Sequence, residues 1–238
     1  MARRYARPAG LVYGSDARQL ITEGRGASLG GLSAIAYTLL EEIGRDGSRR
    51  FVPGTLARAT TLPSFLPPDR PLVMGIVNVT PDSFSDGGRN AEADRAIAHG
   101  ATLAKEGADI LDIGGESTRP GSEGVPIDEE LRRVIPVIEA LAAQGCRVSV
   151  DTRKGAVMRA ALKAGAEIVN DVAALSYEPD AMRAVADAAC PVILMHAQGD
   201  PKTMQLSPQY EDVALDVYDW LEARIEACVA SGIARERI

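Results

Sequence analysis

Long apolar runs, cysteine motifs and aromatic residues are scarce in this sequence of 238 residues, which is 4% aromatic and contains 3 cysteines. No run reaches the roughly 18 uncharged apolar residues of a membrane-spanning helix. The first residues, Met1 to Arg4, lead into no apolar segment typical of a secretory signal. Cys146, Cys190 and Cys228 lack the spacing of zinc ligands. We therefore expect reduced thiols and a cytoplasmic protein that does not bind a membrane.

The charges are mainly acidic and unevenly distributed. There are 26 Lys and Arg residues against 33 Asp and Glu residues, which gives a net charge of −7. Residues 1–70 contain ten Arg and six acidic residues, whereas residues 71–238 contain 16 basic and 27 acidic residues. An acidic surface repels the phosphates of nucleic acids, so no nucleic-acid partner is expected for the longer part. The 46% of hydrophobic residues is typical of a folded protein with a packed core.

Residues 1–71 differ from the rest and are expected to form an N-terminal extension, whose role the sequence does not reveal. This part is rich in Gly and Arg, and its stretch from about Leu32 to Ile43 predicts a helix. Acidic residues such as Asp16 and Glu23 argue against a transit peptide. The connector to the next segment contains prolines at 63, 67, 68 and 71.

From Leu72 onward, short apolar runs alternate with longer amphipathic stretches, which predicts five strand–helix units. The expected strands are Leu72–Val79, Asp109–Ile113, Arg147–Asp151, Glu167–Asp171 and Pro191–His196. The expected helices are Ala91–Glu106, Asp128–Ala143, Gly155–Ala164, Pro179–Ala188 and Pro208–Ser231. Glycines end four of the helix-like stretches, where a positive φ favours them: Gly107, Gly145, Gly165 and Gly232.

This alternation is typical of a parallel sheet covered by helices, either a doubly wound sheet or a (β/α)8 barrel. Each expected strand ends in polar residues: Asn78, Glu116, Asp151, Asn170 with Asp171, and His196. The carboxyl ends of parallel strands share one edge, so residues far apart in sequence are expected to line one pocket there. Taken one at a time, each of these residues could equally be a strand-ending cap or turn former.

Two polar loops follow the first two expected strands. Residues 80–88 contain two carboxylates and one aromatic residue, and residues 114–121 combine glycines with one guanidinium group. Arginine offers paired donors to a phosphate, so the second loop predicts an anion site, although neither loop has the spacing of a nucleotide P-loop. The alternative is that both are ordinary turns chosen for backbone geometry.

Five segments of the chain match one known family in sequence and in order. They are MGIVNVTPDSFSDGG at 74–88, GGESTRPG at 114–121, SVDT at 149–152, VNDV at 169–172, and MH followed by QG within 195–199. With these segments the chain resembles dihydropteroate synthase over residues 72 to about 235. The first two segments are long and specific, whereas the later three support the match mainly by their order.

The resemblance implies a (β/α)8 TIM barrel over residues 72–238, in which about five βα units are present. It also implies a folate-pathway transferase that joins 6-hydroxymethyl-7,8-dihydropterin diphosphate to p-aminobenzoate, with Mg²⁺ as cofactor and diphosphate as leaving group. Family members have eight strands and are usually homodimers, so we expect the sequence to lack the C-terminal part of the barrel. The full-length protein is expected to be a homodimer.

The resemblance also assigns roles to particular residues. Asn78 would bind the metal, Arg119 would hold the departing diphosphate, and Asp151 would lie against the pterin and stabilise its positive charge. The residues expected to be catalytic are Asp151, Asp86 and Arg119. The residues expected to bind substrate are Thr118, Asp151, Asn170, Phe84, Pro120 and Met195.

Two other functions stay open from the sequence. Pterin-dependent methyltransferase domains share the barrel and its polar strand ends, but they do not need the two loops at 80–88 and 114–121. A non-catalytic pterin-binding fragment or module would agree with the small number of strands. It would have less reason to keep both loops.

Overall fold

The structure is a computed structural model that describes residues 3–56, 63, 65–67, 70–79, 88–117, 124–199 and 207–238, with only the backbone given for 88–90. Its contacts divide the chain into two compact units. The first unit comprises Met1–Pro71 and Glu211–Asp216, and the second comprises Leu72–Tyr210 and Val217–Ile238. No helix in the described part is long and apolar enough to cross a membrane.

The first unit is built on an antiparallel sheet. Strand β3 lies at its centre and pairs with β1, β2 and β4. The elements are β1 (Arg4–Tyr13), α1 (Gly14–Thr22), β2 (Ala27–Leu29), β3 (Leu32–Gly44), β4 (Arg49–Pro53) and the short 3-10 helix η1 (Gly54–Leu56).

The helix expected from about Leu32 to Ile43 is wrong, because these residues form strand β3. Their Leu, Ala and Glu content favours a helix locally, but pairing on both sides overrides that preference. Cross-strand ion pairs support this pairing. Glu41, which is buried, accepts hydrogen bonds from Arg7 of β1 and Arg49 of β4, and Glu42 accepts one from Arg50 at 2.6 Å.

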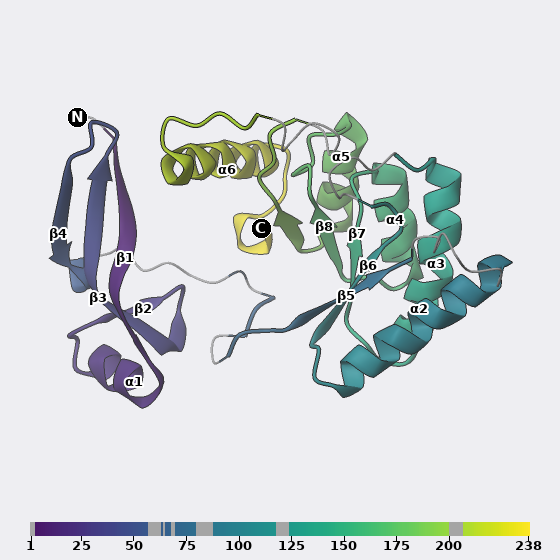
Figure 1. Ribbon diagram of the computed structural model, residues 1–238, viewed down its shortest axis with the longest axis horizontal. Helices are drawn as coiled ribbons and strands as arrows, with labels where there is room; N and C mark the ends of the chain where they lie inside the picture. Colours follow the sequence, from purple (N-terminus) through teal and green to yellow (C-terminus); the bar gives the residue numbers. More distant parts are fainter. Residues whose placement is uncertain are drawn as a thin grey trace. The chain divides into compact units, whose positions relative to one another are not determined.

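The second unit contains five parallel strands in sequence order, as expected. They are β5 (Met74–Asn78), β6 (Ile110–Gly114), β7 (Val148–Asp151), β8 (Ile168–Asp171) and β9 (Val192–Leu194). In the described part, the helices after these strands are α2 (Gly88–Lys105), α3 (Ile127–Ala143), α4 (Gly155–Ala164), α5 (Pro179–Ala188) and α6 (Val213–Ala230), and a 3-10 turn η2 (Arg235–Arg237) follows. The start of α6, up to Asp216, is counted with the first unit. Figure 1 shows α2 to α5 side by side along one face of this sheet.

Glycine ends the helices where the sequence indicated it. Gly107, Gly145, Gly165 and Gly232 have φ values of 108°, 81°, 112° and 95°. Residues other than glycine rarely adopt such positive φ angles. These four glycines therefore fix the point at which each helix ends and the chain turns back toward the sheet. The helices therefore end close to the predicted boundaries.

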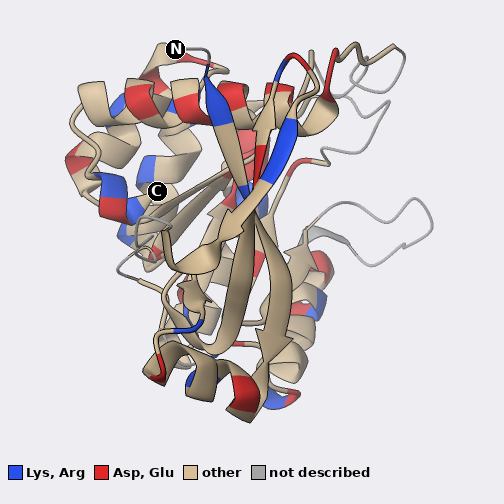
Figure 2. Ribbon diagram, turned by 90° about the vertical axis from the view of Figure 1, so that its left-hand side faces the viewer, with Lys and Arg blue, Asp and Glu red and all other residues tan. Residues whose placement is uncertain are grey.

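Strand register separates an apolar row from a polar row. Val77, Ile113, Val150, Val169 and Val192 are aligned across the five strands, and each is at most 1% exposed. Successive side chains of a strand point to opposite faces, so the next residues along each strand face away from this core. Figure 2 shows charged residues along the helices and on the strands that face the viewer. The five parallel strands contain no Lys or Arg.

Candidate active site

Polar residues occupy the row after the apolar one. Asn78, Gly114, Asp151 and Asn170 are aligned with one another on β5, β6, β7 and β8, at the carboxyl end of each strand. Residues aligned across a parallel sheet project from the same face. The structure therefore brings together Asn78, which was predicted to bind the metal, and Asp151 and Asn170, which were predicted to bind substrate.

Gly114 leaves an open position between two of these side chains. A Cβ atom at Gly114 would lie 3.5 Å from Asp151 Oδ2 and 3.8 Å from Asn78 Oδ1. The carboxylate and the amide oxygen thus flank the same space. The neighbouring Gly115 has a different role, because a Cβ there would lie 2.7 Å from Val134 of α3. Only a residue without a side chain lets this helix approach so closely.

Asp112 joins the polar row from within β6. It is 5% exposed, and its Oδ2 accepts a hydrogen bond from Asn170 Nδ2 at 2.9 Å. In the part of the chain that the structure describes, no group donates a hydrogen bond to Asp112 Oδ1 or Asp151 Oδ1, although both atoms are buried. The row therefore presents hydrogen-bond acceptors that lack donors.

Burial and like charge act together on Asp151. They raise the pKa of Asp151 from 3.8 to about 7, with burial as the largest cause and the charges of Asp112, Asp171, Glu130 and Glu116 adding to it. Burial also raises the pKa of Asp112, although the side chains of Ser149 and Asn170 oppose the change. Carboxyl groups with raised pKa values in a cleft are typical of functional sites.

Asp171, by contrast, has a structural role. It is fully buried, and its two oxygens accept hydrogen bonds from the backbone N–H groups of Ala173 at 2.7 Å and Leu175 at 2.8 Å. These bonds hold a turn in which Ala174 and Leu175 have positive φ angles of 48° and 57°. Burial raises the pKa of Asp171 to about 6, and the two N–H groups oppose that rise.

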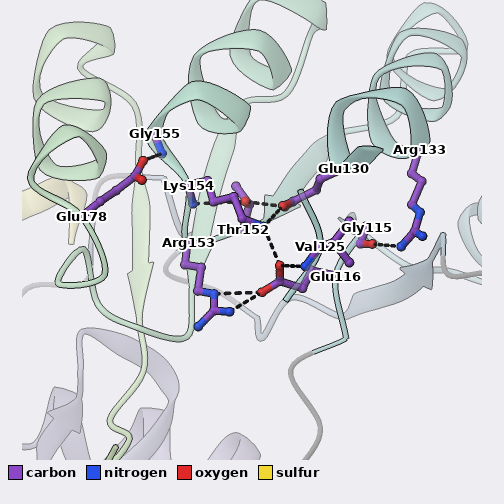
Figure 3. Close-up of polar contacts among 10 residues, drawn as sticks. All are labelled: Gly115, Glu116, Val125, Glu130, Arg133, Thr152, Arg153, Lys154, Gly155 and Glu178. Carbon is purple, nitrogen blue, oxygen red and sulfur yellow. Dashed lines mark hydrogen bonds and ion pairs between the residues drawn. The ribbon is translucent and has the colours of Figure 1, made fainter. Parts of the chain in front are cut away.

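A buried charge cluster lies beside the row, in the loops that follow β6 and β7 (Figure 3). We define the Lys154 cluster as Glu116, Glu130, Thr152, Arg153 and Lys154. Lys154 Nζ donates to both Glu116 and Glu130, and the Thr152 hydroxyl donates to Glu130 at 2.5 Å. Arg153 donates to Glu116 at 2.8 Å. The cluster ties the end of β7 to the loop after β6 and to α3.

Pairing within the Lys154 cluster favours the charged forms of Glu116 and Lys154. Burial alone would raise the pKa of Glu116, but hydrogen bonds from Lys154 and from the Val125 N–H hold that pKa below its ordinary value. Burial would likewise lower the pKa of Lys154, but its two carboxylate partners keep it above its ordinary value. The sequence interpretation placed Glu116 only at a strand end, whereas the structure shows that it anchors a loop.

The fifth strand does not supply the polar residue that was expected at its end. Strand β9 ends at Leu194, so the prediction that it continues to His196 is wrong, and the apolar Ile193 occupies its position in the row. The His196 ring instead forms a T-shaped contact with the Trp220 ring, with ring centroids 5.0 Å apart. Met195 follows the strand and is 39% exposed.

Five of the predicted site residues lie outside the described residues: Phe84, Asp86, Thr118, Arg119 and Pro120. Their roles stay predictions. Sequence reasoning missed two features of the site, namely Asp112 and the Lys154 cluster. A signal for Asp112 was present, because a carboxylate in the middle of the apolar run ILDIG needs a reason to be there.

Asn78 has the chemistry of a magnesium ligand. Mg²⁺ favours oxygen ligands, keeps several waters, and is often held by one or two protein groups together with substrate phosphates. The Asn78 amide oxygen beside the space above Gly114 fits such a site. Within the described residues, no three His, Cys, Asp or Glu side chains form a metal-binding group, so a site made of protein ligands alone is not found there.

Comparison with known proteins identifies relatives of the second unit. Residues 74–238 match the family model described as pterin binding enzyme. The chain is 50% identical over 169 residues to the dihydropteroate synthase of Escherichia coli strain K12, covering 71% of this chain and 60% of that protein. It is 51% identical over 172 residues to that of Neisseria meningitidis serogroup B, with the same coverage. The chain thus spans about 60% of the length of these curated relatives.

Solved structures similar to this chain are also dihydropteroate synthases. Dihydropteroate synthase of Xanthomonas albilineans with 4-aminobenzoic acid is 58% identical, with a TM-score of 0.65, over 71% of this chain and 60% of that one. The Burkholderia cenocepacia enzyme complexed with 7,8-dihydropteroate is 49% identical, with a TM-score of 0.63, over 71% of this chain and 57% of that one. The predicted fold class, a TIM barrel of this type of which five βα units are present, is therefore confirmed.

Lys154→Met tests whether the Lys154 cluster supports the fold. It would leave two buried carboxylates without their ammonium partner, so we expect a loss of about 3–5 kcal/mol in the free energy of unfolding. Urea denaturation measures this loss. The control is Lys163→Met on the exposed side of α4, where we expect a change within about 0.5 kcal/mol. Equal effects of the two substitutions would contradict the importance of the cluster.

Asp151→Asn tests the raised pKa. Because the pKa of Asp151 is raised to about 7, the folded state holds this proton more tightly than the unfolded chain. The resulting stability is present below the ordinary value of 3.8 and is lost as the pH rises through 7. The asparagine variant lacks this loss, so we expect it to be more stable than the native protein above pH 7, by about 2–4 kcal/mol.

Urea denaturation at about pH 5 and pH 8, in EDTA, measures this difference. The variant's advantage should grow from the lower to the higher pH. Asp187→Asn, an exposed control on α5, should change stability little at either pH. A variant advantage that is the same at both values would show that Asp151 does not titrate in this range.

Proposed function

We propose, from the premise that the chain belongs to the pterin binding enzyme family, that the protein is a dihydropteroate synthase. The substrates would be 6-hydroxymethyl-7,8-dihydropterin diphosphate and p-aminobenzoate, and the products 7,8-dihydropteroate and diphosphate. The observation that carries this proposal is the alignment of Asn78, Asp151 and Asn170 at one edge of the sheet. The relatives with 4-aminobenzoic acid and with 7,8-dihydropteroate bound support the substrate assignment.

The pterin is assigned to the face formed by Asp151 and Asn170, with Asp112 behind Asn170. Its aminopyrimidinone ring carries adjacent N–H donors, and the polar row supplies acceptors that lack donors. Acceptors left without partners in a buried site favour a ligand that provides them with hydrogen bonds. The open position at Gly114 gives a flat ring room beside Asp151 and Asn78.

The reaction exchanges one bond at the pterin methylene carbon. Its C–O bond to diphosphate breaks, the aminobenzoate nitrogen forms a C–N bond to the same carbon, and that nitrogen loses a proton. Positive charge develops on the pterin as diphosphate departs. In its ionised form Asp151, with Asp112 nearby, would stabilise this charge, which is the electrostatic contribution expected of a preorganised site.

The other predicted residues complete the proposal. Arg119 would hold the departing diphosphate by paired hydrogen bonds, and Phe84, Thr118 and Pro120 would surround the aminobenzoate. Asp86, which belongs to the same loop as Phe84, would be a catalytic residue. Met195 would contact substrate from the end of β9.

Mg²⁺ is proposed as the cofactor and Asn78 as its protein ligand. When bound, the ion would neutralise negative charge on the diphosphate. Asn78 contributes a neutral oxygen, which suits a site that already receives several phosphate charges. We also propose a homodimer, which rests on the resemblance to the family, and a cytoplasmic location, which is the expectation from the sequence.

The activity itself is tested by diphosphate release from the two substrates. We expect release only when both substrates and Mg²⁺ are present, and we expect EDTA to abolish it. 7,8-Dihydropteroate should form in equal amount. Binding of pterin without diphosphate release would instead support a non-catalytic binding module. Methyl transfer from a methylated pterin would support a methyltransferase domain.

Asp151→Asn tests the electrostatic role. Loss of one preorganised charge typically costs about 3–4 kcal/mol of transition-state stabilisation, so we expect turnover to fall about hundred- to thousandfold. The fold should persist, because the variant removes a buried charge rather than a packed side chain. Steady-state kinetics beside the Asp187→Asn control measure the effect. Unchanged turnover would contradict the role of Asp151.

A further inference from the structure

Asp112 is a buried carboxylate in a strand that is otherwise apolar. Its neighbours Leu111 and Ile113 are 1% and 0% exposed, and Asp112 itself is 5% exposed. A carboxyl group in such surroundings destabilises the fold unless it is well paired. The β6–β7 and β7–β8 ladders already join these strands through their backbones, so the sheet does not need this side chain.

The contact of Asp112 reaches across a strand. Asp112 lies on β6 and Asn170 on β8, with β7 between them. At the level of Asp112, β7 contributes the short side chain of Ser149. The hydrogen bond from Asn170 Nδ2 to Asp112 Oδ2, at 2.9 Å, passes over this position. Asp112 therefore reaches past Ser149, its neighbour in the ladder, to a residue of the polar row.

This hydrogen bond determines which end of the Asn170 amide is available. An ionised carboxylate only accepts hydrogen bonds, so it selects the NH₂ group of the amide. The amide oxygen is then left as the acceptor that faces a ligand. Without Asp112 the amide could rotate and present its NH₂ group instead, which would oppose the N–H donors of a pterin.

We propose that Asp112 is a positioning residue for pterin binding, which holds the Asn170 amide so that its oxygen accepts a hydrogen bond from the pterin. This inference rests on the proposed function, because it takes the pterin as the ligand of the polar row. It adds a residue that the sequence did not assign to the site. Asp112 acts here through Asn170.

The test is a double-mutant cycle on the affinity for 6-hydroxymethylpterin, measured by calorimetry. This probe lacks diphosphate, so no metal is needed for its binding. We expect Asp112→Ala to raise the Kd about ten- to hundredfold, the range for loss of a hydrogen bond to a charged group. If Asp112 acts through Asn170, the double variant should bind within about twofold of Asn170→Ala alone.

Two further variants separate positioning from stability. Asp112→Asn keeps an oxygen that can accept from Asn170 Nδ2, so it should recover most of the affinity lost in Asp112→Ala. Asp109→Ala is the matched control at the other end of β6, where Asp109 accepts a hydrogen bond from the Val73 N–H at 2.8 Å. It should lower the Tm and leave the Kd within about twofold of the native value.

The possible results distinguish the inference from the function on which it rests. A native protein that neither binds the probe nor releases diphosphate would overturn the proposed function and this inference with it. A native protein that does both, with an unchanged Kd for Asp112→Ala or additive effects in the cycle, would overturn the inference alone. If Asp112→Ala does not fold, the same cycle with Asp112→Ser decides between these outcomes.

Discussion

The arrangement of the site depends on the register of five parallel strands. Because aligned residues share a face, one step along every strand converts an apolar row of Val77, Ile113, Val150, Val169 and Val192 into a polar row. The hydrophobic effect fixes the first row against the helices. The face on which the second row lies is then fixed as well, because a register shift of one residue would bury Asp151 and Asn170 against the helices. The core therefore positions the chemistry.

The Lys154 cluster extends this order from the strands into the loops. A backbone ladder ends with its strand, and residues beyond it need other contacts. Here a lysine between two carboxylates, with Arg153 and Thr152 beside it, joins the end of β7 to Glu116 and to α3. Burial makes an unpaired member of such a cluster costly, so its members hold one another in place. The loop after β6 thereby begins at a fixed point.

Features set by local sequence were predictable, and features set by pairing between distant segments were not. The second unit's helices and their glycine ends follow from periodicity and from the φ angles that glycine allows. Strand β3 did not follow, because Leu, Ala and Glu favour a helix until β1 and β4 pair on both sides. His196 was misplaced for a similar reason: apolar content predicts a strand but does not indicate where its last pairing partner is. Asn78, Asp151 and Asn170 were predictable because each ends a strand, whereas Asp112 lies inside one.

The distribution of charge within the second unit explains why the carboxyl groups of the polar row are not paired with a cation. Arg153 and Lys154 lie close to the acidic residues, but both are engaged by Glu116 and Glu130. Within the described residues, no cation forms an ion pair with Asp112 or Asp151. Burial and the nearby carboxylates therefore raise the pKa of Asp151 to about 7, and the site gains its negative charge as Asp151 ionises around that pH. A rearrangement that moved Lys154 to Asp151 would remove this potential, and it would leave Glu116 and Glu130 without their ammonium partner. By engaging the lysine elsewhere, the Lys154 cluster preserves a negative site suited to a ligand that brings N–H donors and develops positive charge as it reacts.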